Sequence, residues 1–139
     1  MPRVSVIVPT YNRRDCLVET LRTALNQSYR DFEILVVDDG SSDESAVEVL
    51  RQLGPDPERP ESIWRQHTAS SSGACGFSFW KSDVLVQYIF QANRGIGAAR
   101  NRGLQAVQGE YVAFLEPEYA WDPHHLERVA RRPVLGMGR

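Results

Sequence analysis

The sequence predicts an α/β fold in which an open, mostly parallel sheet carries helices on both faces. Short runs of β-branched and aromatic residues alternate along the chain with segments of helical apolar periodicity. The apolar runs lack a clean two-residue alternation of polar and apolar side chains, which is typical of strands buried on both faces. A chain of 139 residues is long enough for one domain with a real core.

The first strand and helix are predicted near the N-terminus. Residues 4–8 form a β-branched run that we expect to end at Pro9. Asn12 and Asp15 are helix-start signals. The apolar positions of residues 17–25 then recur on one face of a helix.

A second strand and helix follow in the same order. Residues 32–37 form another apolar run, and the polar segment DDG comes directly after it. Ser41 and Glu44 have the spacing of a capping box. The apolar residues between positions 47 and 53 continue this pattern as a second helix.

The second half of the chain repeats the alternation. Residues 84–90 are a third predicted strand, 95–107 a third helix and 111–115 a fourth strand. After Pro123 a short amphipathic turn carries Leu126 and Val129. Strands that alternate with helices in this way favour parallel pairing.

Residues 54–83 do not follow the pattern. This segment is rich in proline, glycine and serine, and we interpret it as an atypical loop insertion at the surface of the domain. A lid or partner-binding loop is the alternative, because disordered segments rarely contain so many aromatic residues, here Trp64, Phe77, Phe79 and Trp80.

Charge and hydropathy exclude several classes of partner. Sixteen basic residues against eighteen acidic ones give a net charge of −2 without a block of like charge, so no nucleic acid or membrane-surface partner is indicated. The N-terminal apolar run is too short for a signal peptide, and no stretch approaches the roughly 20 residues of a membrane span. We expect a cytoplasmic protein without a transmembrane segment.

Four polar loops follow the predicted strands. In an open parallel sheet, ligands bind beyond the carboxyl ends of the strands. We therefore expect the four loops to cluster along one sheet edge: PTYN at 9–12, DDGSSD at 38–43, NRGIGAARN at 93–101 and EPEYAWD at 116–122.

These loops carry groups that a nucleotide would need. Tyr11 offers a ring for a base, and Asp39 offers an acceptor for a base N–H or for ribose hydroxyls. Gly95 and Gly97 permit close approach of an anion to a helix N-terminus, where the helix dipole favours negative charge. Arg100 adds a positive charge for a diphosphate.

Each loop also has a structural interpretation. Residues 9–12 are typical of a strand-ending turn, and residues 38–41 of a turn and helix cap. Glu116 and Glu118 either hold a divalent metal against a diphosphate or are solvated loop charges. The dinucleotide fingerprint GxGxxG fails, because Arg100 occupies the third glycine position.

The order of the motifs makes the chain resemble the family 2 glycosyltransferases, which are inverting enzymes with the Rossmann-like GT-A fold. The segments that carry the resemblance are VSVIVPTYNR, FEILVVDDGSSD, NRGIGAARNRGL, GEYVAFL and WDP. The resemblance implies a donor-binding domain over residues 1–127, while residues 128–139 form an unassigned tail. It also implies that a nucleotide-diphosphate sugar, most often a uridine diphosphate (UDP) sugar, binds with a bridging Mn²⁺ or Mg²⁺ ion.

By position, the resemblance assigns Thr10, Tyr11 and Asp39 to the base and ribose, and Arg100 to the vicinity of the diphosphate. The full set of implied sugar-nucleotide residues is Pro9, Thr10, Tyr11, Asp39, Gly97 and Arg100. Glu116 and Glu118 occupy the positions of the family's DxD metal motif.

The metal motif departs from the family pattern. The family usually has FLDSDD where this chain has FLEPEY, so both metal-binding aspartates are glutamates and Tyr119 replaces the next aspartate. The longer side chains, with a proline between them, predict a weakened metal site.

The acceptor-binding half that follows in the family is expected to be missing. The general base that deprotonates the acceptor belongs to that half, so no catalytic residue is assigned and the chain alone is expected to transfer no sugar. The first hypothesis is a glycosyltransferase donor-binding domain. Its alternatives are a non-catalytic nucleotide-sugar-binding or interaction module and, more remotely, an NAD-binding Rossmann domain.

Overall fold

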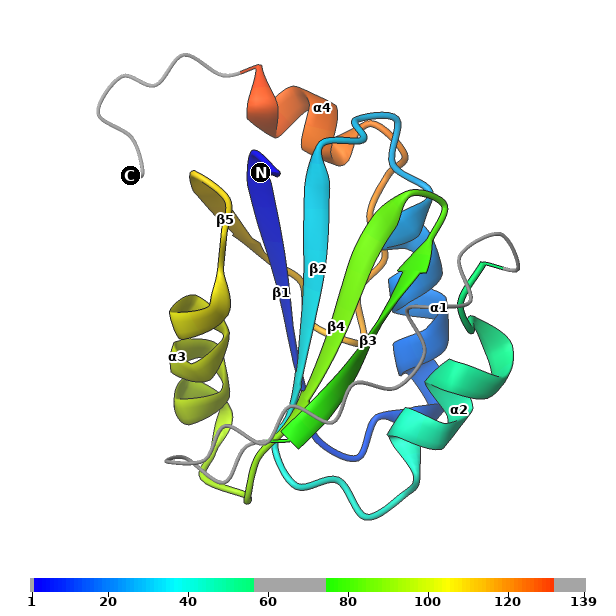
Figure 1. Cartoon of the computed structure of the whole chain (residues 1–139), viewed down its shortest axis with the longest axis vertical. Helices are drawn as coiled ribbons and strands as arrows, with labels where there is room; N and C mark the ends of the chain where they lie inside the picture. The colour runs from blue at the N-terminus through cyan, green and yellow to red at the C-terminus, as the bar shows by residue number, and fades with distance from the viewer. Residues whose placement is uncertain (1, 57–74, 132–139) are drawn as a thin grey trace.

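The computed structural model describes residues 2–56 and 75–131 (Figure 1). Within these ranges the elements are β1 (Val4–Thr10), α1 (Arg14–Leu25), β2 (Phe32–Asp38), α2 (Ser45–Gln52), β3 (Cys75–Lys81), β4 (Val84–Phe90), α3 (Ile96–Ala106), β5 (Tyr111–Phe114) and α4 (His125–Ala130). Over the same residues, no helix combines the length and the apolar character that a bilayer crossing requires.

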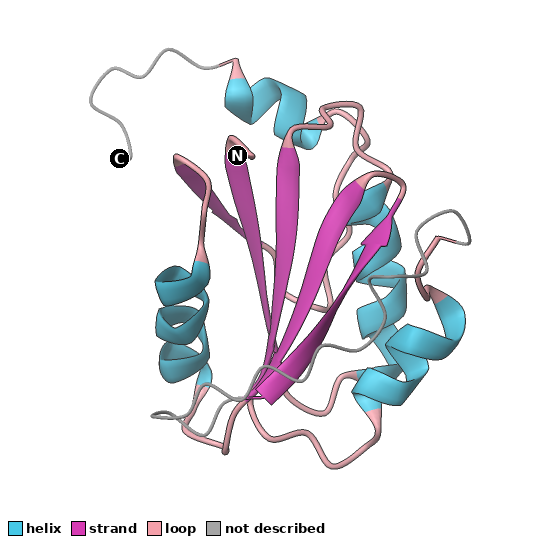
Figure 2. Ribbon diagram, in the orientation of Figure 1, coloured by secondary structure: helices cyan, strands magenta, loops and turns pink. Residues whose placement is uncertain are grey.

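The five strands form one sheet in the order β3-β4-β2-β1-β5. The pairs β1–β2, β1–β5 and β2–β4 are parallel, and β3 runs antiparallel to β4. Helix α3 covers one face, whereas α1 and α2 lie on the other (Figure 2). The predicted fold class, a mostly parallel sheet with helices on both faces, is confirmed.

The two faces of the sheet have cores of different size. The larger core lies on the side of α1 and α2 and includes Leu126 from α4. The smaller core joins α3 to β1 and β2 through Ile7, Leu35, Val37 and Ala99. Gly103 lets α3 come close to the sheet, because a Cβ there would lie 2.7 Å from Cγ2 of Ile7.

Strand β1 does not end at Pro9 as expected, and its pairing explains why. The carbonyls of Arg3 and Ile7 accept hydrogen bonds from the β5 side, from the N–H groups of Tyr111 and Leu115 at 3.0 and 2.9 Å. The next donor of this ladder would be the amide of Pro9, which has no hydrogen. Pairing with β2 continues past this point, whereas pairing with β5 stops. The two strands therefore separate at their carboxyl ends.

The first helix-start prediction is half correct. Asp15 lies in the first turn of α1 as expected. Asn12, however, does not cap the helix: its φ is +51°, and its side-chain oxygen accepts the N–H of Ser42 at 2.8 Å. The amide of Arg14 is instead satisfied by Asp43 at 3.0 Å. The loop after β1 is thus tied to the loop after β2.

The predicted capping box of α2 is wrong. The helix begins at Ser45, and Glu44 precedes it in a left-handed conformation without a side-chain cap bond. Ser41 is engaged elsewhere, because its hydroxyl accepts the N–H of Asn12 at 2.8 Å. Asp43 satisfies the Ser45 amide at 3.1 Å.

The expectation of a structureless loop over residues 54–83 is wrong for residues 75–81, which form β3. Phe77 and Phe79 are buried, and the ring of Phe77 stacks on Tyr88 at 5.0 Å. These two aromatic residues therefore belong to the core and not to a lid. Residues 57–74, including Trp64, lie outside the described residues.

Glu48 connects α1 to α2 through its carboxylate. It contacts the guanidinium groups of Arg51 at 2.6 Å and Arg14 at 3.2 Å, and it accepts a hydrogen bond from Gln52. The hydrogen bonds from Arg51 and Gln52 lower the pKa of Glu48 from its ordinary 4.5 to about 2.

Glu48→Gln is expected to flatten the acid dependence of stability. Because the folded-state pKa is depressed, the stabilisation is complete above pH 4.5 and disappears as the pH falls towards about 2. Urea unfolding between pH 4.5 and about 2 should show that the free energy of unfolding falls more steeply for the wild type than for Glu48→Gln. Glu19→Gln, which removes a carboxylate that is 77% exposed on α1, is the control. If the free energy of unfolding depends on pH in the same way for the wild type and Glu48→Gln, the carboxylate of Glu48 does not stabilise the fold.

Candidate functional site

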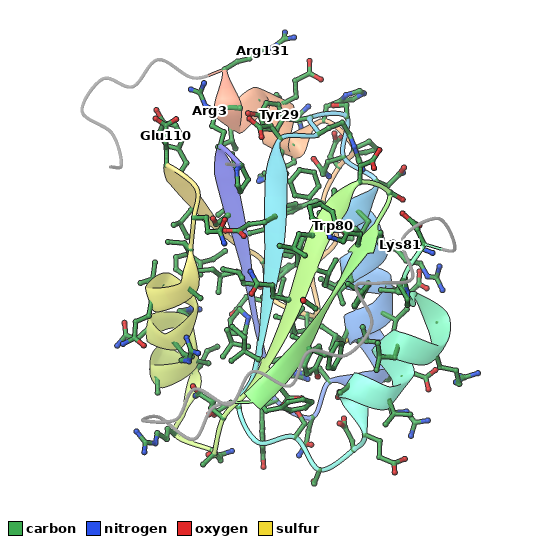
Figure 3. All side chains as sticks on the ribbon, in the orientation of Figure 1. Arg3, Tyr29, Trp80, Lys81, Glu110 and Arg131 are labelled. Carbon is green, nitrogen blue, oxygen red and sulfur yellow. The ribbon has the colours of Figure 1, made fainter. Side chains whose placement is uncertain are left out.

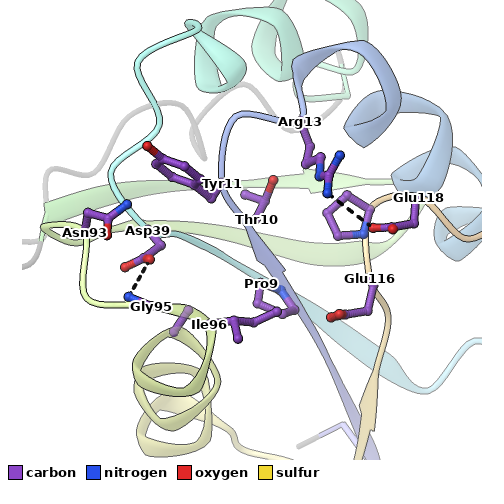
Figure 4. Close-up of a pocket in the computed structure, with 12 residues that line it drawn as sticks. Pro9, Thr10, Tyr11, Arg13, Asp39, Asn93, Gly95, Ile96, Glu116 and Glu118 are labelled. Carbon is purple, nitrogen blue, oxygen red and sulfur yellow. Dashed lines mark hydrogen bonds and ion pairs between the residues drawn. The ribbon is translucent and has the colours of Figure 1, made fainter.

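A cavity of about 500 Å³ lies at the carboxyl ends of β1 and β2 (Figure 4). Residues from all four predicted loops line the cavity, which confirms that these loops meet. The lining consists of Pro9, Thr10, Tyr11, Arg13, Asp39, Asn93, Gly95, Ile96, Ala99, Glu116, Pro117 and Glu118. The side chains of Arg3 and Glu110 mark the opposite end of the sheet (Figure 3).

The topology explains why the cavity forms here. From β1 the sheet grows through β2 to β4 in one direction, and the chain then returns through α3 to β5 on the other side of β1. Crevices at such a reversal of strand order are the usual ligand sites of open α/β sheets. Pairing between β1 and β5 ends at Ile7 and Phe114, because Pro9 has no N–H that could continue it.

Thr10 and Tyr11 present different chemistry to the cavity. Thr10 is only 3% exposed, and its hydroxyl has no hydrogen-bond partner among the described residues. Tyr11 is 49% exposed, and its ring lies on the same side of the cavity as Asp39 and Asn93 (Figure 4). A buried hydroxyl without a partner beside an accessible ring suits a polar ligand that also has an aromatic face.

Asp39 supports the start of α3. Its Oδ1 accepts the N–H of Arg94 at 2.8 Å and Nε2 of Gln91 at 2.9 Å, while Oδ2 accepts the N–H of Gly95 at 2.8 Å. Gly95 has φ of +98°, a conformation that favours glycine. A carboxylate has about four acceptor positions, so Asp39 retains roughly one for a ligand.

The contacts of Asp39 lie just before the start of α3. The carboxylate of Asp39 binds the amides of Arg94 and Gly95, which precede the first residue of α3, Ile96. Gly97 is not among the residues that line the cavity, and a Cβ on it would meet nothing within 4 Å. The role of Gly97 at a ligand stays a prediction.

Arg100 also lies outside the lining, but it reaches the site through Glu116. Its Nη2 lies 3.0 Å from Oε1 and 3.3 Å from Oε2 of Glu116. The guanidinium also lies over the ring of Phe114, 5.8 Å from its centroid. Glu116 thus carries its own counter-charge.

Glu118 faces a different arginine. Its carboxylate lies 3.9 Å from Nη2 of Arg13, and both side chains are about half exposed. In Figure 4 Glu118 is directed towards Arg13, and Glu116 lies lower, on the side of Pro9 and Ile96. Across residues 2–56 and 75–131, no three His, Cys, Asp or Glu side chains gather in a way that could hold a metal ion. Glu116 and Glu118 each face an arginine, and these positive charges disfavour a divalent ion shared by the two carboxylates.

Sequence reasoning missed the polar residues of α1 that hold the loop after β5. Thr20 donates to the carbonyls of Pro117 and, at 2.9 Å, Tyr119. Thr23 accepts the N–H of Trp121 at 3.1 Å. Beyond the C-terminal end of the helix, the side chain of Gln27 binds the backbone at Asp122 and Leu126. The signal that could have indicated these contacts is the presence of polar residues within the apolar stripe of the helix.

Comparison with known proteins identifies the family. A family model described as glycosyl transferase family 2 matches residues 5–86 and 77–132. An uncharacterized glycosyltransferase of Nostoc sp. is 34% identical over 129 residues, which are 91% of this chain and 31% of the relative. The putative teichuronic acid biosynthesis glycosyltransferase TuaG of Bacillus subtilis is 33% identical over 91% of this chain and 40% of its own length. The chain therefore spans less than half of either relative.

Solved structures agree with this assignment. Residues 1–349 of Staphylococcus aureus TarS in complex with UDP superpose with a TM-score of 0.64 at 25% identity, over 92% of this chain and 31% of that one. The mannosyltransferase PcManGT of Pyrobaculum calidifontis, in complex with GDP-Man and Mn²⁺, gives 0.62 at 29% identity over 86% of this chain and 28% of that one. The chain belongs to glycosyltransferase family 2.

Proposed function

We propose that the cavity binds a nucleotide-diphosphate sugar, specifically a UDP-sugar, as the donor for glycosyl transfer to an acceptor that we do not assign. The observation that carries the proposal is the meeting of four strand-end loops in one cavity at the reversal of strand order. Two related TarS structures contain UDP and UDP-GlcNAc, which supports uridine as the base.

The wall residues suggest how the donor is held. The ring of Tyr11 is accessible for stacking on the base. The free hydroxyl of Thr10 and the remaining acceptor position of Asp39 suit the polar edges of base and ribose. Arg13 and Arg100 provide positive charge for the diphosphate. We assign no general base among these residues.

We do not include the metal ion, the domain limits or the location of the protein in the proposed function. The PcManGT neighbour contains Mn²⁺, but Glu116 and Glu118 of this chain each face an arginine. A bridging Mn²⁺ or Mg²⁺ is therefore not part of the donor site proposed here. The domain limits at residues 1–127 and the cytoplasmic location stay predictions.

UDP is expected to bind more tightly than NAD, and Tyr11→Ala is expected to weaken UDP binding about tenfold through loss of base stacking. Isothermal titration calorimetry of the full chain measures both. Tyr119→Ala is the matched control, because it removes a ring that is 62% exposed outside the cavity lining. NAD affinity equal to that of UDP, or equal losses in the two tyrosine variants, would contradict the proposed site and favour the Rossmann or interaction-module alternatives.

A further inference from the structure

We infer that this site neutralises the donor's diphosphate with Arg100 and Arg13 instead of a divalent metal, so that nucleotide binding needs neither Mn²⁺ nor Mg²⁺. The inference rests on the proposed donor site and concerns its charge balance. The acidic side chains of the cavity wall are Asp39, Glu116 and Glu118. Each of them already has a partner within the described structure.

Glu116 is the less available of the two possible metal ligands. Both of its oxygens contact Nη2 of Arg100, and the pair is partly buried, with Glu116 27% exposed. The contact of Arg100 with Phe114 holds the guanidinium in place. A dication bound to Glu116 would lie next to this fixed positive charge or would have to displace it, and both reduce metal affinity.

The two glutamates also diverge. Glu116 is held by Arg100 from α3, whereas Glu118 faces Arg13 at the entrance to α1. Pro117 fixes its own φ and restricts Glu116, which opposes a rearrangement that would bring both carboxylates together. Magnesium requires nearly ideal octahedral oxygen geometry, and manganese also prefers octahedral oxygen ligands. Two carboxylates that point to different arginines do not supply such a site.

The arginines, in contrast, keep donors for a phosphate. Arg100 uses Nη2 for Glu116, and a guanidinium has further N–H groups in a planar arrangement that matches phosphate oxygens. Arg13 lies 3.9 Å from Glu118, which is an ion pair too long for a hydrogen bond, so it can turn to a ligand at low cost. Both side chains are 41–51% exposed: Arg13 lines the cavity, and Arg100 lies just outside the lining beside Glu116. Together they can contact both phosphates of a nucleoside diphosphate.

UDP titrations of the full chain in EDTA, Mg²⁺ and Mn²⁺ test this inference. The dissociation constant is expected to agree within about twofold in the three conditions. Arg100→Gln should weaken UDP binding about tenfold, equally with and without metal, because it removes charge-assisted hydrogen bonds. Glu116→Gln should bind UDP as tightly as the wild type or more tightly. On this inference Glu116 binds no metal, and the substitution removes a negative charge near the diphosphate.

Arg131→Gln is the matched control, because it removes the same charge at the far end of the molecule, where Arg131 pairs with Glu127 at 3.2 Å (Figure 3). Its UDP affinity should equal that of the wild type. UDP binding that requires Mn²⁺ or Mg²⁺ and is lost in Glu116→Gln would overturn the inference and leave the proposed function intact. No binding of UDP in any of the three conditions would overturn both.

Discussion

Asp39→Ala is expected to lower the free energy of unfolding by about 2–3 kcal/mol and to weaken UDP binding about tenfold or more. The carboxylate is 4% exposed and accepts hydrogen bonds from Gln91, Arg94 and Gly95. Alanine removes the acceptor of the two backbone N–H groups, whose hydrogen bonds are partly buried, and the start of α3 loses its link to the end of β2. Because α3 forms one wall of the cavity, its displacement should also reduce affinity.

Three measurements separate the structural and the ligand-binding roles of Asp39. Urea unfolding gives the loss of stability, calorimetry gives the loss of affinity, and hydrogen exchange reports on the amides of Arg94 and Gly95. Both amides should exchange faster in the variant. Asp31→Ala, which removes an exposed acid, is the charge control and should change stability by less than about 0.5 kcal/mol. Unchanged exchange at Arg94 and Gly95 would show that Asp39 does not support α3.

The parallel part of the fold was predictable because its strands lie in the interior. Burial on both faces leaves β1 and β2 as almost continuous apolar runs, and these are visible in one sequence. Strand β3 was not recognised because it is an edge strand whose buried residues, Phe77 and Phe79, alternate with the partly buried Ser78 and Trp80 inside a serine- and glycine-rich segment. A period of two over so few positions is a weak signal.

The place of the site was predictable, but its internal contacts were not. The rule that ligands bind beyond parallel strand ends is enough to bring Tyr11, Asp39 and Glu116 together. It does not say that Asp39 binds the amides of Arg94 and Gly95, because those contacts depend on how closely the loop before α3 approaches the end of β2. The pairing of Arg13 with Glu118 joins segments that are distant in the chain, and the sequence pattern gives no indication of such contacts.

Tyr88 links the core to the candidate site through Asp38. The phenol is fully buried and donates to Oδ2 of Asp38 at 2.5 Å, while Oδ1 accepts the N–H of Ser41 at 2.8 Å. The hydroxyl of Ser41 in turn accepts the N–H of Asn12. The loops after β1 and β2 are therefore anchored to Tyr88, a side chain of β4 in the larger core.

Tyr88→Phe is expected to lower the free energy of unfolding by about 2–3 kcal/mol, because it leaves the buried carboxylate of Asp38 with one fewer donor. Phenylalanine keeps the ring that stacks on Phe77, so lost packing contributes little. In a double-mutant cycle with Asp38→Asn, the two substitutions should be coupled by about 1–2 kcal/mol, since the second removes the charge that the first leaves unsatisfied.

The pH dependence gives an independent test of the same contact. Burial, and then the charge of Asp38, raises the pKa of Tyr88 well above its ordinary 10.0. The folded state thus keeps a proton that the unfolded state releases above pH 10, so wild-type stability should fall as the pH rises through that value. Tyr88→Phe should lack this fall in stability above pH 10. The free energies of unfolding of the wild type and the variant should therefore converge at high pH. Additive effects in the cycle together with parallel curves above pH 10 would mean that Asp38 finds another donor, and that the site loops do not depend on Tyr88.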